Sequence, residues 1–309
     1  MRWLAVLLLA LLAAPILAAD YQRYPDLIYT RIGQTVLRLD LYIPKTSSPP
    51  PLILYIHGGD WMFGHKRLWP PLFLLGHGFA LASIDYRLAP HARFPAQIQD
   101  CRDALVYLHD NASRYHFDAS QIGALGESAG GHLAALLATA SDEKAFDGSR
   151  KPKGTVPRLS AVVSISGPMD LENLGDLGDM LEDTVGRNPI QNLLGGRMKD
   201  KRTLAQLASP IRHVTPDDPP MLLVCGEQDI VVPSFQAQQM QEALENAGVP
   251  VETLPIAGIG HDMPAIWHSQ APDHIARFFE DCLIHHRPPA TKPTTIPTHS
   301  SPDDPFLTR

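Results

Sequence analysis

The 309-residue sequence has little cysteine, no excess of positive charge and few long apolar runs. Its three cysteines, Cys101, Cys225 and Cys282, are too few and too far apart for a disulfide framework or a zinc site. At most one bridge can form among them, and the pairing stays open. Lys and Arg total 26 against 33 Asp and Glu, with a formal net charge of -7 and no basic stripe. This balance argues against a nucleic-acid partner.

The N-terminal stretch MRWLAVLLLALLAAPILAADY has the order of segments found in secretory signal peptides. Arg2 precedes an apolar run, and small residues follow at Ala18 and Ala19. The alternative, an uncleaved anchor helix, fits less well because the run is shorter than the roughly 20 apolar residues that a spanning helix needs. We therefore predict a signal peptide over residues 1–19 and an exported protein, periplasmic or secreted, with no stable membrane span.

Short apolar runs alternate with helical patterns through the rest of the chain, which contains no internal repeat. The composition is 44% hydrophobic, enough for one large core, so we expect one domain over residues 20–286. Near-continuous apolar runs fit central strands of a parallel sheet: LILYIH, FALASID, QIGALG, LSAVVSIS and MLLVCG. The segment TVLRLDLYIP alternates apolar and polar residues and predicts a half-exposed strand at the sheet edge. Helical patterns cover 96–115, 129–140, 234–247 and 272–286.

This alternation predicts the α/β class, with a mostly parallel central sheet and helices on both faces. Residues 168–215 interrupt it with scattered glycines, and we expect a small cap or substrate-lining insert there. Residues 287–309 are rich in Pro, Thr and Ser, which is typical of a disordered tail.

The segment GESAGG at 126–131 fits the pattern G-x-S-x-G. An apolar run precedes it and a helical pattern follows it, so the motif lies at a strand-to-helix turn. Glycines at 126 and 130 permit a strained turn that exposes Ser128 above the sheet, where its hydroxyl can attack a substrate. The pattern alone is weak, and a plain glycine turn is the alternative. Its context favours Ser128 as a nucleophile.

A serine nucleophile needs a base, and the base needs an orienting acid. In this fold class the order along the chain is Ser, Asp or Glu, then His. The segments CGEQDIVVP and IAGIGHDMP each follow an apolar strand, and they contain Asp229 and His261. Both loops open at the carboxyl end of the sheet, where Ser128 lies. We therefore predict that these three side chains converge.

Other residues compete for these roles. Glu227 is closer to the strand end than Asp229 and remains a lesser candidate for the acid. Asp262 is disfavoured because residues adjacent in sequence rarely orient one another's side chains. His132 lies inside the helix after Ser128, and we expect it to pack in the interior or form an interior hydrogen bond.

The segment HGGDW at 57–61 follows the strand LILYIH and predicts an oxyanion hole. A tetrahedral intermediate carries a negative oxygen, which preorganised donors must hold. One donor is the backbone N–H after the nucleophile, at Ala129, and the others are the N–H groups of Gly59 and Asp60. The alternative is a plain turn after a strand. His57 and Trp61 are expected to shape this loop and not to react.

Together these motifs resemble the α/β-hydrolase superfamily, and within it the esterase/lipase group whose loop reads H-G-G-G-W. The chain is similar to small secreted esterases of the feruloyl and acetylxylan type. The resemblance runs from about Leu52 to Phe279 and includes DYRLAP, FPAQIQD, GESAGGHLAALLA and SGPMDL. It implies an α/β-hydrolase fold with a small cap insert and hydrolysis of carboxylic esters by Ser128, Asp229 and His261. It also implies no metal and no other cofactor.

One residue departs from that pattern, because Asp60 replaces the third glycine of the loop. A carboxylate beside the oxyanion would oppose its formation, so its side chain is expected to turn away or activity to be reduced. It would also disfavour acidic substrates. In DYRLAP, Asp85 and Arg87 are expected to fix the neighbouring loops by a charge-assisted hydrogen bond.

The expected partner is an ester substrate, either a small molecule or an ester linked to a polysaccharide. Activity is expected to fall as the pH drops through the range where histidine protonates, around 6.5. A small-amide hydrolase, of the formamidase or peptidase type, is the first alternative because the same triad cleaves both bonds. A non-catalytic binding protein on the same fold is a weaker alternative, favoured only by Asp60.

Overall fold

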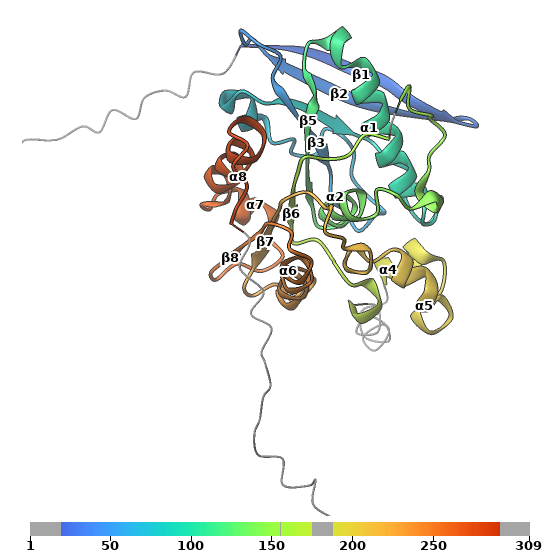
Figure 1. Ribbon diagram of the computed structural model, residues 1–309. Helices are drawn as coiled ribbons and strands as arrows, with labels where there is room; N and C mark the ends of the chain where they lie inside the picture. Colours follow the sequence, from blue (N-terminus) through green and yellow to red (C-terminus); the bar gives the residue numbers. More distant parts are fainter. Residues whose placement is uncertain (1–19, 155, 175–187, 291–309) are drawn as a thin grey trace, which may run out of the picture.

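An eight-stranded sheet lies at the centre of the protein in its computed structural model, which describes residues 20–154, 156–174 and 188–290 (Figure 1). Its strands lie in the order β1-β2-β4-β3-β5-β6-β7-β8. The pairs β1/β2 and β2/β4 are antiparallel and every other pair is parallel. The strands are β1 Tyr21–Ile32, β2 Thr35–Pro44, β3 Pro51–Ile56, β4 Ala80–Ile84, β5 Asp118–Glu127, β6 Ala161–Ile165, β7 Met221–Gly226 and β8 Val251–Ile256.

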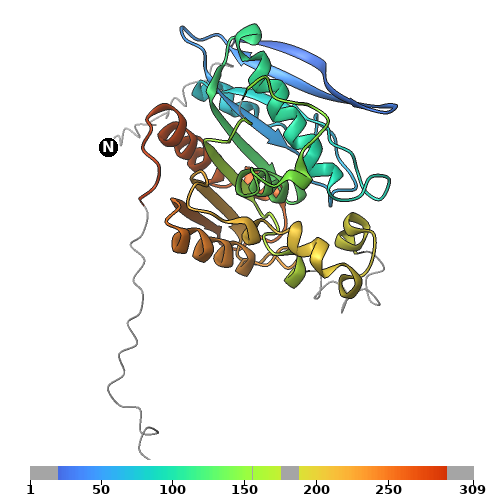
Figure 2. The same ribbon diagram turned by 45° about the vertical axis from the view of Figure 1, so that its right-hand side comes forward.

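Helices cover both faces of this sheet (Figures 1 and 2). Successive strand residues point to opposite faces, so Leu54 joins one apolar cluster while Ile53 and Tyr55 join the other. Helices α1, α2 and α6 contribute to the first cluster, and α8 contributes to the second. The helices are α1 Ala96–Tyr115, α2 Ala129–Thr139, α4 Pro189–Leu194, α5 Met198–Leu207, α6 Phe235–Ala247, α7 Met263–Trp267 and α8 Ala271–Phe279, with 3-10 turns η1 Leu72–His77, η2 Lys144–Phe146 and η3 Pro210–His213. The predicted α/β class is confirmed.

The sheet edge differs from the sequence prediction. The segment Thr35–Pro44 was expected at the edge, but it forms β2, an interior strand between β1 and β4. The edge is β1, whose mixed polar sequence YQRYPDLIYTRI has no regular alternation and whose first half is mostly exposed. Its pairing register shifts between Tyr24 and Leu27, around a proline that cannot donate a ladder hydrogen bond. Pairing with β2, and not a local pattern, makes this segment a strand.

The C-terminal helical pattern is divided in two. The predicted helix 272–286 is α8 followed by a π-helical turn, η4, at Glu280–Ile284. The three cysteines are buried and free, and Cys225 lies in β7 as expected. Within the described segments, no helix is long and apolar enough to cross a membrane.

The insert at 168–215 contains more regular structure than its sequence indicates. Its described parts are residues 168–174 and 188–215. The second part forms α4, α5 and η3, of which η3 contacts α2 and α4 contacts α5 (Figures 1 and 2). The Phe94 backbone N–H donates to the Leu193 carbonyl at 2.9 Å, and this bond joins the insert to the loop before α1. Residues 175–187 lie outside the described part of the chain. So do the predicted signal peptide, 1–19, and residues 291–309 of the predicted tail.

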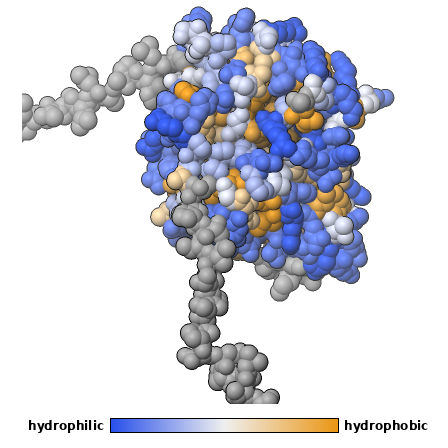
Figure 3. Space-filling model, viewed as in Figure 1, coloured by the Kyte–Doolittle hydropathy of each residue, from blue (hydrophilic) through white to orange (hydrophobic). Residues whose placement is uncertain are grey.

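The face seen in Figure 3 is mostly hydrophilic, with apolar side chains in separate areas.

The two residues predicted to fix the neighbouring loops, Asp85 and Arg87, bind different partners. Asp85 accepts a hydrogen bond from the Lys66 backbone N–H at 2.8 Å, while the Arg87 guanidinium binds both carboxylate oxygens of Asp100. Each therefore fixes a different loop at the carboxyl end of the sheet.

Candidate active site

Ser128 occupies the turn between β5 and α2. Its backbone φ and ψ are 49° and -118°, a region that residues with a side chain rarely adopt. Its N–H donates to the Ile165 carbonyl of β6 at 2.7 Å, which holds the turn against the neighbouring strand. At Gly130 a Cβ atom would lie 2.0 Å from the Ile56 carbonyl oxygen, so only glycine fits there. The local sequence and the tight packing together produce the strained turn that the motif predicts.

The structure brings the three predicted residues together. The Ser128 hydroxyl lies 3.0 Å from Nε2 of His261, and Nδ1 of the same imidazole lies 2.7 Å from Oδ2 of Asp229. An Nδ1–H that donates to the carboxylate leaves Nε2 as the acceptor for the serine hydroxyl. Ser128 follows β5, Asp229 follows β7 and His261 follows β8. Three carboxyl strand ends therefore supply one hydrogen-bonded relay.

Asp229 is held on both of its oxygens. Oδ1 accepts from the backbone N–H groups of Val231 at 2.9 Å and Val232 at 2.8 Å, while Oδ2 accepts from His261. Burial by itself would raise the pKa of this carboxyl, but the hydrogen bonds outweigh burial, and the pKa of Asp229 lies below its ordinary value. The group is therefore ionised at neutral pH and able to stabilise an imidazolium.

In the described residues, neither rival acid forms a hydrogen bond or ion pair with the His261 imidazole. The Glu227 side chain is exposed. The Asp262 side chain accepts from the Ala265 backbone N–H at 3.0 Å and caps the start of α7. Asp229 is the acid that the geometry selects.

The predicted oxyanion loop lies directly against the nucleophile. A Cβ atom on Gly58 would be 2.9 Å from the Glu127 carbonyl oxygen and 3.5 Å from Cβ of Ser128. The loop turns sharply, and the Gly59 carbonyl accepts from the backbone N–H groups of Met62 and Phe63 at 2.9 and 2.8 Å. Among the described residues, the N–H groups of Gly59 and Asp60 have no hydrogen-bond acceptor. They are thus free to bind a substrate oxygen.

Asp60 has a positive φ of 56°, and the residue is half-buried. Its carboxylate forms no hydrogen bond or ion pair with any residue in the described segments. The departure from the glycine pattern therefore leaves a carboxylate without a protein partner next to the predicted oxyanion donors.

His57 and Trp61 support this loop from within. The His57 ring stacks on Tyr86 with ring centroids 4.3 Å apart, and Nδ1 lies 2.7 Å from the Gly58 carbonyl oxygen. Burial lowers the pKa of His57 to about 4, so its ring is neutral at physiological pH. Trp61 is 3% exposed, and its indole N–H donates to Nδ1 of His132 at 3.1 Å. The predicted interior hydrogen bond of His132 is confirmed.

Sequence reasoning missed Glu127, the residue before the nucleophile. Its Oε1 accepts from the Tyr55 hydroxyl and from the Trp267 indole N–H, both at 2.8 Å. Burial raises the pKa of Glu127, and these two hydrogen bonds oppose that effect. Trp267 ends α7, which begins just after His261, so Glu127 connects the nucleophile strand to the segment that carries the base. An acid inside an apolar strand was the available signal.

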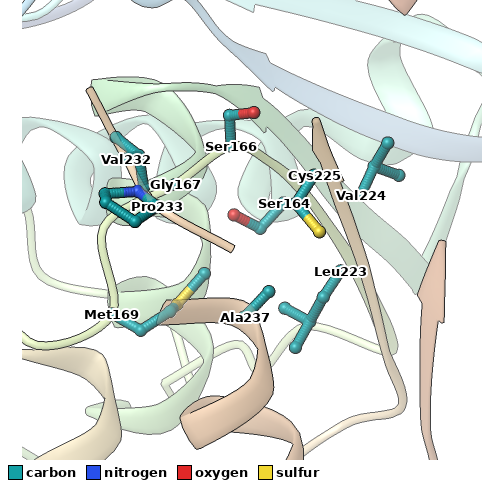
Figure 4. Close-up of a pocket in the computed structure, with 10 residues that line it drawn as sticks. All are labelled: Ser164, Ser166, Gly167, Met169, Leu223, Val224, Cys225, Val232, Pro233 and Ala237. Carbon is teal, nitrogen blue, oxygen red and sulfur yellow. The ribbon is translucent and has the colours of Figure 1, made fainter. Parts of the chain in front are cut away.

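A small cavity of about 10 Å³ is lined by residues of β7 and α6 and by Val232 and Pro233, which follow Asp229 in the chain (Figure 4). Apolar side chains of β7 and α6 line it, together with Ser164 and Ser166, whose buried hydroxyl oxygens have no protein partner. The space is about that of one water molecule and is too small for an ester substrate. It belongs to the packing beneath the site, not to the substrate cleft.

A family model described as BD-FAE matches residues 39–244, which is more than half of the chain. The chain belongs to the BD-FAE family. The match contains Ser128 and Asp229 and ends before His261, so the base is identified by its geometry alone. In the described segments, no group of three or more His, Cys, Asp or Glu side chains is arranged to hold a metal ion.

Relatives of this BD-FAE chain include two esterases from Mycobacterium tuberculosis. It is 31% identical to Esterase LipC over 70% of its length and 29% identical to Esterase LipQ over 84%. It spans 54% of LipC and 63% of LipQ, so it corresponds to little more than half of these curated relatives.

A truncated carbohydrate esterase from gut microbiota has a similar structure. It has a TM-score of 0.74 and 27% identity, and the alignment covers 86% of this chain and 98% of that one. The α/β-hydrolase fold and the predicted resemblance to its esterase group are both confirmed.

Proposed function

We propose that this BD-FAE protein hydrolyses carboxylic esters, with Ser128 as nucleophile, His261 as base and Asp229 as orienting acid. The observation that carries the proposal is the unbroken relay from Ser128 to Asp229, with distances of 3.0 and 2.7 Å. The similarity to esterases along most of the chain supports the same activity.

In the proposed reaction, the Ser128 oxygen attacks the ester carbonyl carbon while its proton moves to Nε2 of His261. The carbonyl oxygen becomes an oxyanion, held by the N–H groups of Gly59, Asp60 and Ala129. His261 returns its proton to the leaving alcohol, and an acyl-enzyme remains. A water molecule then attacks the carbonyl carbon of the acyl-enzyme and gives a proton to His261. His261 passes this proton to the Ser128 oxygen as its bond to the acyl group breaks, and the carboxylic acid is released.

Exposed apolar side chains flank the proposed reaction centre. Phe63 of the oxyanion loop is 53% exposed, and Ile230 and Val231, which follow Asp229, are 87% and 52% exposed. Apolar groups at this place suit the carbon chain or ring of an ester. We infer that they and the helices α4 and α5 of the insert, acting as a cap, select the substrate.

The test uses the chain from Asp20 with p-nitrophenyl acetate, butyrate and octanoate, and with a small formamide. Ser128→Ala is expected to lower kcat by at least about 1,000-fold on every ester. Ser120→Ala, a serine on the exposed start of β5, is the matched control and should retain full activity. Turnover of the formamide but not the esters would favour the amide alternative, and no turnover of either would favour a binding protein.

A further inference from the structure

A buried chain of hydrogen bonds joins the oxyanion loop, the nucleophile helix and the insert. The Trp61 indole N–H donates to Nδ1 of His132 at 3.1 Å, and Nε2 of the same ring lies 2.7 Å from the Ala208 carbonyl oxygen. His132 is fully buried, and its ring meets the Trp61 ring edge to face with centroids 5.2 Å apart. None of these groups belongs to the proposed triad.

The partners determine the tautomer of His132. An indole N–H can only donate, so Nδ1 must be the acceptor, and a carbonyl can only accept, so Nε2 must carry the proton. The ring is therefore neutral. Burial lowers the pKa of His132 to about 4, which agrees with this assignment. The ring is a fixed, uncharged link between two elements.

The oxyanion loop needs such a link. Asp60 and Trp61 both have positive φ, 56° and 57°, and this conformation is unfavourable for residues with a Cβ atom. Strained backbone of this kind persists only where surrounding contacts hold it. Two carbonyl groups of the loop are anchored, since the Ala89 N–H donates to the Trp61 carbonyl at 2.8 Å and the Tyr86 hydroxyl donates to the His57 carbonyl at 3.0 Å. The bond to His132 anchors the Trp61 side chain, at the end of the loop opposite to the His57 ring that stacks on Tyr86.

His132 also lies one helical turn after the nucleophile. Its backbone N–H donates to the Ser128 carbonyl at 3.0 Å. Because His132 holds the Trp61 side chain, helix α2 fixes the position of Trp61 relative to Ser128. This geometry relates the oxyanion donors to the attacking oxygen.

We propose that His132 is a positioning residue, which holds the oxyanion loop at its working distance from Ser128 through the hydrogen bond to Trp61. The proposal rests on the proposed esterase function and deepens it. In this role the Nδ1 acceptor is essential to the rate, whereas the Nε2 bond to Ala208 serves to fix the tautomer and to attach the insert.

Two amide variants separate these bonds. In His132→Gln the side-chain amide N–H reaches the position of Nε2 and retains a donor for Ala208, but the acceptor for Trp61 is lost. In His132→Asn the side-chain oxygen lies near the position of Nδ1 and retains that acceptor, but the donor to Ala208 is lost. His213→Gln is the matched control, because His213 also contacts an insert carbonyl, that of Leu207, at 2.8 Å and forms no hydrogen bond with the loop at 57–61 in the described segments.

His132→Gln is expected to lower kcat for p-nitrophenyl acetate about 10- to 100-fold with KM changed less than about threefold, since the defect concerns the transition state. Trp61→Phe is expected to do the same, and the double variant to lose no more than either single variant. His132→Asn and His213→Gln should retain kcat within about threefold. The indole N–H resonance of Trp61 should shift in His132→Gln and remain in place in His213→Gln.

The outcomes distinguish this inference from the proposed function. If the wild type does not turn over esters, the proposed function fails. If the wild type is active and folded His132→Gln retains its kcat, or if the losses of Trp61→Phe and His132→Gln multiply, the positioning role is wrong while the esterase stands. Should His132→Gln not fold, Trp61→Phe decides alone, and an unchanged kcat there overturns the inference.

Discussion

Asp229→Asn removes one acceptor oxygen from a side chain that uses both of its oxygens. The carboxylate accepts on both oxygens, from His261 on one and from Val231 and Val232 on the other. An asparagine amide has only one acceptor oxygen. Whichever way it turns, its NH₂ group faces a hydrogen-bond donor.

The two orientations of the asparagine amide differ in free energy. With NH₂ toward the loop, two backbone N–H groups lose their acceptor, at about 1 to 3 kcal/mol each. With NH₂ toward His261, the imidazole needs only to become the acceptor at Nδ1, and neutral imidazole carries its proton on either nitrogen. The second orientation is therefore favoured. It places the proton on Nε2, which then donates to Ser128 and no longer acts as base.

We expect Asp229→Asn to lower kcat about 1,000- to 10,000-fold with little change in KM. The assay is p-nitrophenyl acetate hydrolysis, with urea unfolding to show that the variant is folded. Glu227→Gln and Asp262→Asn are matched controls, because neither side chain is hydrogen-bonded to the His261 imidazole in the described residues, and both should retain kcat within about twofold. A folded Asp229→Asn with more than a tenth of wild-type kcat would refute the tautomer argument, and a large loss in either control would assign the acid elsewhere.

Two further predictions concern stability. Burial lowers the pKa of His57 and of His132 from 6.5 to about 4, so the unfolded chain binds protons in that interval and the folded protein does not. The contribution of His132 to stability is thus complete above pH 6.5 and falls by about 3 kcal/mol on acidification to pH 4. The destabilisation caused by His132→Asn, measured by urea unfolding, should therefore be smaller at pH 4.5 than at pH 7.5, and a constant difference would contradict the cause. Gly130→Ala would place a Cβ 2.0 Å from the Ile56 carbonyl oxygen, so we expect loss of more than about 4 kcal/mol and of activity, whereas Gly76→Ala, with open space around it, should change unfolding little.

Much of the site could be predicted because its signals are local in the sequence. Ser128 is flanked by glycines at a strand-to-helix junction, and Asp229 and His261 each follow a strand. Parallel strands that end at one edge of a sheet bring such residues together whatever lies between them. The same argument predicted the oxyanion loop at 57–61. For these residues, the pattern of short apolar runs was sufficient.

Other features depend on contacts between distant segments. β1 is a strand because β2 pairs with it, and no alternation in its own sequence indicates so. Glu227 and Asp229 are separated by two positions, and only the direction of each side chain shows which one meets His261.

The chain alone therefore determined the fold class and the positions of the reactive groups, since periodicity and strand ends are properties of neighbouring residues. The tertiary structure decided which groups are hydrogen-bonded to which. Glu127 with Trp267, and Trp61 with His132, are pairs far apart in sequence that burial brings into contact. Burial also decided the protonation of His132, because a buried ring loses its hydration and takes the form that its two hydrogen-bond partners can satisfy.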